Sequence, residues 1–224
     1  LLARNLICFQ NTTNSNYHTG NFIPSNWAKE FNKSAFDVIN LHWVAGETMS
    51  IEDIGRIKKP VIWTLHDMWP FCGAEHTTDY DDNVRWRVGY QKLNRLDNDT
   101  GIDINKYIWK RKNKSWDKLM HIVSPSRWLA DCARESMLFK YMPVTVIPNV
   151  LDTSVFQPLN RDFCRLALGL PDDKKIILFG SAGGTKDINK GYYLLLAALK
   201  YLSVNISPKE VLIVVFGQSE PEEN

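Results

Sequence analysis

The chain has 224 residues, of which 44% are hydrophobic and 23% are charged, values that are ordinary for a globular protein. Its formal net charge of +2 gives no global attraction to nucleic acid. The 4 cysteines lie far apart without a C-x-x-C pair, which argues against a disulfide framework or a four-thiolate zinc site and favours a reducing compartment.

Short apolar runs alternate with helical patterns along the chain. The expected strands are Asn5–Phe9, Asp37–Leu41, Pro60–Leu65, Met120–Ser124, Val144–Ile147, Lys175–Gly180 and Glu210–Gly217. The expected helices are Ile51–Ile57 capped by Ser50, Ile104–Trp116 capped by Asp103, Arg127–Glu135 capped by Ser126, and the leucine-rich Gly191–Tyr201. Because strands that are apolar along most of their length are typical of parallel sheets covered on both faces, the fold class is α/β.

The segment Pro148–Arg161 has turn residues and no hydrophobic period, so it reads as a linker. Beyond it the alternation of strands and helices begins again. We therefore expect a first α/β lobe over residues 1–150, a linker over 151–160, and the start of a second lobe over 161–224.

A histidine and an aspartate, His66 and Asp67, follow the expected strand Pro60–Leu65. Ligands of open parallel sheets bind at the carboxyl ends of the strands, so these two side chains are candidate site residues. The alternative is structural: a histidine bonded to a backbone carbonyl and an aspartate that caps a turn.

The next loop mixes aromatic rings with polar groups and is a candidate acceptor pocket, because rings stack on sugar faces and carboxylates bind hydroxyls. Its candidate residues, with the preceding aspartate, are Asp67, Trp69, Phe71, Glu75 and His76. A metal site at His66, Asp67, Cys72, His76 and Asp79 is an alternative, but this spacing matches no common zinc pattern, and we expect no metal. A loop that only covers the lobe remains a further alternative.

A glycine-rich loop joins the strand Lys175–Gly180 to the helix that starts at Gly191. Glycines admit close approach of an anion, and a helix start offers free N–H groups and a positive dipole, so the loop is a candidate diphosphate site. The alternative is an ordinary glycine turn with solvated lysines. The candidate residues are Gly183, Gly184, Thr185, Lys186, Lys190 and Gly191.

The basic and aromatic segment Lys106–Lys118 is compatible with contact to an anionic membrane surface. The alternative is a solvated helix face whose rings pack into the core. No nucleic-acid motif accompanies the charge, so nucleic acid is not an expected partner.

Taken together, these segments resemble the family 4 retaining glycosyltransferases of the GT-B type. The matching stretches are Asp37–Trp43, Val61–Asp67, Ile122–Leu129, Val146–Phe156 and Asn189–Gly191 with the helix that follows. The Trp69–Gly73 loop resembles the branch that builds bacterial surface polysaccharides.

The resemblance implies two Rossmann-like lobes that face each other across a cleft, with the acceptor on the first lobe and a nucleotide-sugar on the second. His66 matches the histidine near donor sugar and acceptor, and Lys190 matches the lysine that holds the donor diphosphate. Asn149 and Asp152 match the hinge motif, in which Val150 replaces the usual glycine. The family's arginine falls near Gly184 and is absent, and a lysine cannot reproduce its bidentate contact with phosphate.

The resemblance also implies a first strand and glycine-rich loop before Leu1, and a donor-binding segment with two glutamates beyond Asn224. The piece by itself is therefore expected to be inactive. In the whole enzyme we expect transfer of a hexose, with retention, from a nucleotide-sugar to a saccharide or lipid-linked acceptor, without a cofactor. The expected location is the cytoplasm or the inner face of the cell membrane. The alternatives are a non-catalytic sugar-binding protein with the same lobes and a nucleotide-sugar epimerase.

Overall fold

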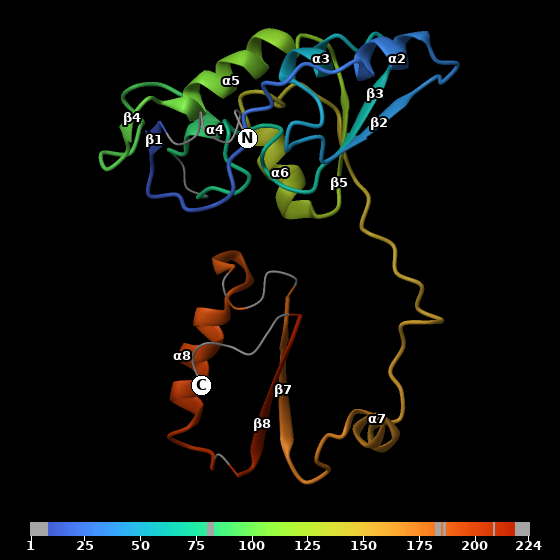
Figure 1. Ribbon diagram of the computed structural model, residues 1–224, viewed down its shortest axis with the longest axis vertical. Coiled ribbons are helices and arrows are strands. Elements are labelled where there is room, and N and C mark those ends of the chain that lie inside the picture. Colours follow the sequence, from blue (N-terminus) through green and yellow to red (C-terminus); the bar gives the residue numbers. More distant parts are fainter. Residues whose placement is uncertain (1–8, 80–82, 182–184, 186, 208, 218–224) are drawn as a thin grey trace. The chain divides into compact units, whose positions relative to one another are not determined.

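The computed structural model describes residues 9–79, 83–181, 185, 187–207 and 209–217 (Figure 1). The chain divides into two compact units, unit 1 over residues 1–150 and unit 2 over residues 151–224. The division falls where the expected linker starts, and residues 151–160 carry neither helix nor strand.

Unit 1 contains a parallel sheet of four strands in the order β2-β3-β5-β6. The strands are β2 (Ile39–His42), β3 (Val61–Thr64), β5 (His121–Ser124) and β6 (Val144–Val146). Each lies inside or within one residue of its predicted range, so the α/β class with a parallel sheet is confirmed. The predicted strand Asn5–Phe9 lies outside the described residues apart from Phe9, which is in a turn.

The three predicted caps of unit 1 are present. Ser50 accepts the Asp53 N–H at the start of α3 (Ile51–Gly55), and Asp103 accepts the Lys106 N–H at the start of α5 (Ile104–Ser115). Ser126 accepts the Leu129 N–H at the start of α6 (Arg127–Glu135). These bonds satisfy backbone donors that have no partner inside their own helix. The elements of unit 1 that were not predicted are α2 (Trp27–Lys33), α4 (Arg85–Val88) and the two-strand ribbon of β1 (Gln10–Asn11) and β4 (Thr100–Gly101). The helix Arg161–Leu168 of unit 2 was not predicted either.

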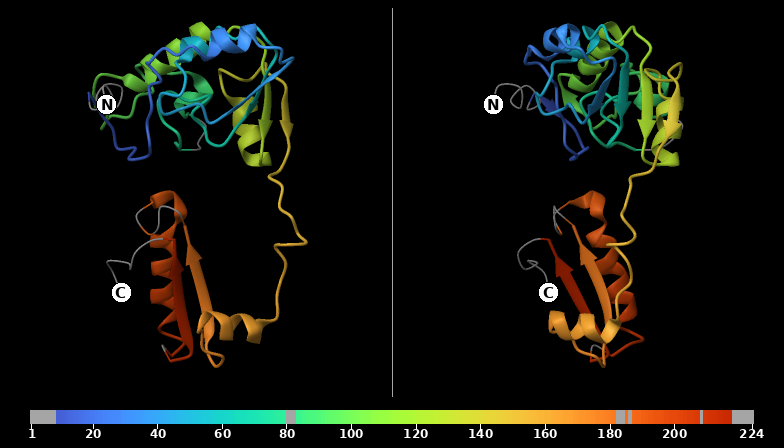
Figure 2. Two further views of the ribbon diagram at one scale, coloured as in Figure 1. Left: turned by 45° about the vertical axis from the view of Figure 1, so that its right-hand side comes forward. Right: turned by 90° about the vertical axis from the view of Figure 1, so that its right-hand side faces the viewer.

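Helices flank this sheet, with α3 beside α5, and α6 packed against β5 and β6 (Figures 1 and 2). The core between them is aromatic: the Trp63 and Trp116 rings meet edge to face with centroids 5.1 Å apart, and Trp69 contacts Trp116 at 6.2 Å. Three buried indole N–H groups donate to backbone carbonyls, Trp69 to Thr19, Trp86 to Asp79 and Trp116 to Ile51. Such pairing removes the cost of a buried polar group.

Unit 2 contains α7 (Arg161–Leu168), β7 (Lys175–Gly180), a 3₁₀ turn (Ile188–Lys190), α8 (Tyr192–Leu202) and β8 (Val211–Phe216). Strands β7 and β8 pair in parallel in full register, and α8 runs alongside them (Figures 1 and 2). The predicted strands Lys175–Gly180 and Glu210–Gly217 and the predicted helix Gly191–Tyr201 are confirmed within one residue. None of the helices in the described ranges has both the length and the apolar character that a membrane span requires.

Candidate functional site

The carboxyl ends of β2 and β3 bring two histidines together. The strands are in register, so His42 lies opposite Thr64, and His66 follows two residues later. The chain after β3 is anchored by buried Leu65, whose N–H donates to the Val123 carbonyl at 2.8 Å. His42 Nδ1 and His66 Nε2 lie 3.0 Å apart, which is a hydrogen bond between two exposed imidazoles.

One proton lies between these rings, because one nitrogen must donate while the other accepts. The bond leaves Nδ1 of His66 available at an exposed edge of the sheet. An imidazole held in this way can orient a hydroxyl or exchange a proton with it.

Asp67, in contrast, is fully engaged by protein groups. Its Oδ2 accepts the Trp43 indole N–H at 2.8 Å and lies 2.6 Å from His76 Nδ1, while its Oδ1 accepts the Trp69 N–H at 3.0 Å. The other nitrogen of His76 meets the Thr19 hydroxyl at 2.9 Å. Asp67 and His76 therefore form a framework beside His66, and His76 is buried within it.

The loop after β2 is held in a costly backbone conformation. Trp43 has φ 40° and Glu47 has φ 67°, both in the left-handed region. Such positions cost about 1–3 kcal/mol each and persist where surrounding contacts enforce them. Trp43 is held by its indole bond to Asp67, and the Glu47 carboxylate accepts the N–H groups of Phe22 and Ile23 at 2.6 and 2.8 Å. The strain lies directly after His42, which indicates a position under functional constraint.

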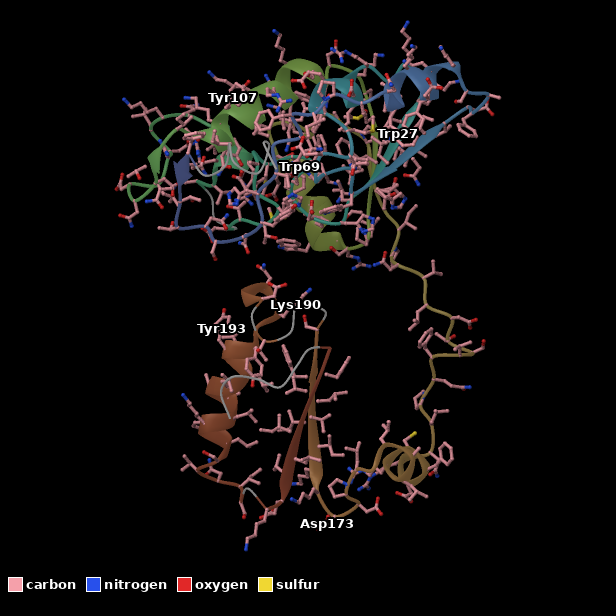
Figure 3. The ribbon with its side chains drawn as sticks, in the orientation of Figure 1. Trp27, Trp69, Tyr107, Asp173, Lys190 and Tyr193 are labelled. Carbon is pink, nitrogen blue, oxygen red and sulfur yellow. The ribbon has the colours of Figure 1, made fainter. Side chains whose placement is uncertain are left out.

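Two predicted acceptor residues are core residues. Trp69 is 1% exposed and Phe71 is 0% exposed, and their rings pack against other aromatic side chains. Figure 3 labels Trp69 inside unit 1. Because protein atoms cover their faces, stacking on a sugar is not available to them in this structure, and their role here is packing. The alternative of a loop that covers the lobe describes these two rings better.

Glu75 is also buried, and it forms a polar cluster with Tyr90 and the backbone of Gly73. Tyr90 donates its hydroxyl to Glu75 Oε1 at 2.5 Å and accepts the Gly73 N–H at 2.8 Å. Burial raises the pKa of Tyr90 and of the Cys72 thiol well above their ordinary values. Both groups therefore stay neutral at physiological pH, and Cys72 is a poor nucleophile.

Lys112, on α5, binds the backbone of the loop that contains Trp69 and Gly73. Its ammonium group is fully buried and donates to the backbone carbonyls of Trp69, Cys72 and Gly73, the last two at 3.1 and 2.6 Å. It also lies 3.7 Å from the centre of the Trp69 ring, a cation–π contact. Burial lowers the pKa of Lys112 from 10.5 to about 7.

The basic segment Lys106–Lys118 is therefore partly internal. Lys112 and Trp116 are buried, and Arg111 bonds the Glu52 carboxylate at 2.6 and 2.8 Å. The aromatic rings of this segment are not all in the core, because Trp116 is buried whereas Tyr107 is exposed. The lysines of this segment that remain exposed for contact with a membrane are Lys110, Lys114 and Lys118. Such contact stays a prediction.

The expected diphosphate loop lies at the carboxyl end of β7 in unit 2. Gly183, Gly184 and Lys186 lie outside the described residues. Gly191 is the N-cap of α8 with φ 72°, a conformation that glycine adopts without strain. Lys190 is exposed directly before it and is labelled in Figure 3.

This turn is ordered by Asp187, whose backbone carbonyl accepts the Lys190 N–H at 3.0 Å and whose side chain accepts the Asn189 N–H at 3.0 Å. The start of an eleven-residue helix together with an exposed lysine is a suitable anion site.

His42, Thr19 and Tyr90 were not predicted as site residues, and Lys112 was predicted only as part of the basic segment Lys106–Lys118. His42 directly follows its predicted strand, and this place at the carboxyl end of an expected parallel strand is the signal that could have found it. Within the described ranges, no group of three or more His, Cys, Asp or Glu side chains is arranged to hold a metal ion.

No model of a known protein family matches this chain, and no curated protein is significantly similar to it.

The lowered pKa of Lys112 predicts how the stability of unit 1 depends on pH. Because the folded protein binds this proton less tightly than the unfolded chain, the lysine penalises folding at acid pH, and the penalty is relieved as the pH rises above about 7. The free energy of unfolding of the wild type, minus that of Lys112→Met, should rise between pH 7 and 9, with a slope of up to about 1.4 kcal/mol per pH unit.

All 8 tryptophans precede residue 129, so denaturant unfolding followed by tryptophan fluorescence reads unit 1 alone. A difference that is flat or falls over this window would contradict the buried ammonium. If the variant does not fold, the pH titration of the wild-type Lys112 ¹⁵Nζ signal reads the same proton.

Proposed function

We propose that this chain is the acceptor-side lobe, with the beginning of the donor-side lobe, of a glycosyltransferase. The reaction moves a sugar, with retention, from a nucleotide-sugar to a saccharide or lipid-linked acceptor. The observation that carries the proposal is His66, an exposed imidazole at the carboxyl end of a parallel strand, hydrogen-bonded at 3.0 Å to His42. Its neighbour Asp67 is occupied by three other groups, so His66 is the group left to meet a ligand.

In the proposed reaction, His66 contacts the acceptor hydroxyl. His42 acts as a positioning residue, because its ring fixes the hydrogen-bonding state of His66 Nε2. Asp67 and His76 keep the loop in place and take no proton from the acceptor. The carboxylate next to His66, that of Asp67, is held by three protein groups, so a covalent glycosyl-enzyme is not part of the proposal.

The donor diphosphate is proposed to bind at the turn before α8. Negative charge builds on the leaving nucleoside diphosphate, and Lys190 together with the N–H groups at the start of α8 stabilises it. The departing phosphate itself takes the proton of the acceptor. A pre-organised cation and helix N–H groups supply this stabilisation without a divalent metal.

A histidine substitution tests the acceptor side. In the whole protein, His66→Ala should lower kcat by about 10²-fold, the usual cost of losing one group that contacts the reacting atoms, with donor affinity unchanged. The matched control is His121→Ala, an exposed histidine at the start of β5, where activity should stay within a few-fold of wild type. Equal activity of the His66 and His121 variants would remove His66 from the site.

A lysine substitution tests the donor side. Lys190→Ala should lower kcat by about 10²–10³-fold, because one charge-stabilising group is lost at the leaving phosphate. It should also weaken binding of nucleoside diphosphates measured by calorimetry. Lys200→Ala, on the last turn of α8, is the control of equal charge and should change neither quantity. Activity of Lys190→Ala within a few-fold of wild type would contradict the role.

A further inference from the structure

Two exposed aromatic rings lie against the buried imidazole of His76. Measured between ring centroids, the Tyr17 ring lies 4.8 Å and the Trp43 ring 5.8 Å from the His76 ring. His76 is 5% exposed, whereas Tyr17 is 42% exposed and Trp43 is 46% exposed. Tyr17 and Trp43, here called the aromatic pair, come from separate parts of the chain, before α2 and after β2. They share one buried support.

Contacts on two edges hold the Trp43 ring in one orientation. Its indole N–H donates to Asp67 Oδ2 at 2.8 Å. The far edge of its six-membered ring lies beside Gly46, where an added β-carbon would be 3.5 Å from Trp43 Cη2. Because the single polar atom of the side chain is bonded, the exposed part of the side chain is ring carbon. A ring that is already fixed loses little conformational freedom when a ligand covers it.

The backbone of Trp43 indicates that this orientation has a use. A bulky residue rarely adopts a φ of 40°, and such strain is typical of positions that contact ligands. In the free protein the strained residue leaves 46% of its surface in water, so burial offsets little of the strain. A ligand that covers the ring would remove this apolar surface from water, which is favourable.

The aromatic pair borders the strand-end site. Trp43 directly follows His42, whose ring bonds His66 at 3.0 Å. The Trp43 indole in turn bonds Asp67, the residue after His66. A flat apolar ring therefore lies next to an exposed imidazole that has a nitrogen available for a hydrogen bond.

This combination of groups suits a pyranose. A pyranose has C–H faces that can lie on an aromatic ring, and it has hydroxyls at its edge that can bond an imidazole. Trp69 and Phe71, the rings predicted to stack on a sugar, are buried, whereas Tyr17 and Trp43 are open to a ligand.

We propose that the aromatic pair binds the acceptor saccharide, with a hexopyranose unit stacked on Trp43 and one of its hydroxyls directed to His66. The substrate class is a saccharide whose terminal hexopyranose has an open C–H face, as glucopyranosides and galactopyranosides have. The identification of this saccharide as an acceptor rests on the proposed function. Its binding to the aromatic pair requires neither a donor nor the turn before α8.

The test is ¹⁹F NMR of the chain labelled with 5-fluorotryptophan. The probes are methyl β-glucopyranoside, methyl β-galactopyranoside and cellobiose, without any nucleotide-sugar. The Trp43 signal, identified by its loss in Trp43→Phe, should shift with a Kd of about 1–10 mM. The matched control is the signal of Trp27, which is 52% exposed on α2 and is labelled in Figure 3, and it should not move. An unmoved Trp43 signal with all three glycosides would overturn the proposal.

Two further ligands distinguish a sugar face from other chemistry. Sorbitol has the hydroxyls of a hexose without a rigid C–H face, and uridine carries a base that stacks by its π-face. Both should bind about tenfold more weakly than cellobiose, as read from the Trp43 signal. Equal binding of sorbitol would show hydroxyl contact without stacking, and equal binding of uridine would show a base site. Either result contradicts the proposal.

Variants of the whole protein locate the acceptor. Trp43→Ala should raise the acceptor KM about tenfold with the donor KM unchanged, and Trp43→Phe, which keeps a ring, should recover part of the loss. Tyr17→Ala leaves the indole bond to Asp67 in place and should also raise the acceptor KM, whereas Trp27→Ala should not. A wild-type acceptor KM in both Trp43→Ala and Tyr17→Ala refutes the site and leaves the transfer proposal standing. Glycoside binding at Trp43 in a whole protein without transferase activity supports the saccharide site and contradicts the transfer proposal alone.

Discussion

The buried ammonium group of Lys112 is the constraint on which the rest of unit 1 depends. Burying a charge is costly unless hydrogen bonds compensate for lost hydration. Lys112 offsets part of that cost with the carbonyls of Trp69, Cys72 and Gly73 and with the Trp69 ring. These carbonyls belong to one loop, which has no strand or helix of its own to satisfy them. A single side chain from α5 thus fixes the path of the loop that follows the strand-end site.

The path of this loop separates its polar residues into two groups. Toward the strand ends, Asp67 and His76 bond each other and leave His66 exposed. On the other side, buried Glu75 accepts the Tyr90 hydroxyl. Because Glu75 and His76 are consecutive, a shift of one moves the other. The proposed acceptor contact and the buried pair of Glu75 and Tyr90 therefore share one support.

Local sequence information was sufficient for the strands of the two parallel sheets and for the starts of α3, α5, α6 and α8. The caps Ser50, Asp103 and Ser126 act on an N–H three residues away, so spacing alone identifies them. The long-range contacts were not predictable in the same way. Lys112 sits in a basic run that suggests a solvated face, yet Ile104, Ile108 and Lys112 are four residues apart and share the buried side of α5. That spacing was the sequence signal that Lys112 is buried. The charge of lysine favoured the opposite prediction, an exposed side chain.

The aromatic residues illustrate the same difficulty. Trp69 and Phe71 have the composition of a sugar-binding loop, and only the packing of the loop against α5 reveals them as core. His66 and Lys190 were placed by motif and position, and the described structure leaves both exposed in their own units. The pairing of His42 with His66 depends on the register of β2 and β3, which a single sequence does not specify.

Amide hydrogen exchange in Lys112→Met tests the central claim most directly. If Lys112 holds the loop, exchange of residues 68–76 should become at least tenfold faster in the variant, while exchange of β3 (Val61–Thr64) stays close to wild type. Unchanged protection of residues 68–76 would contradict the account, and so would equal acceleration of the loop and β3, because the lysine would then contribute only to general stability.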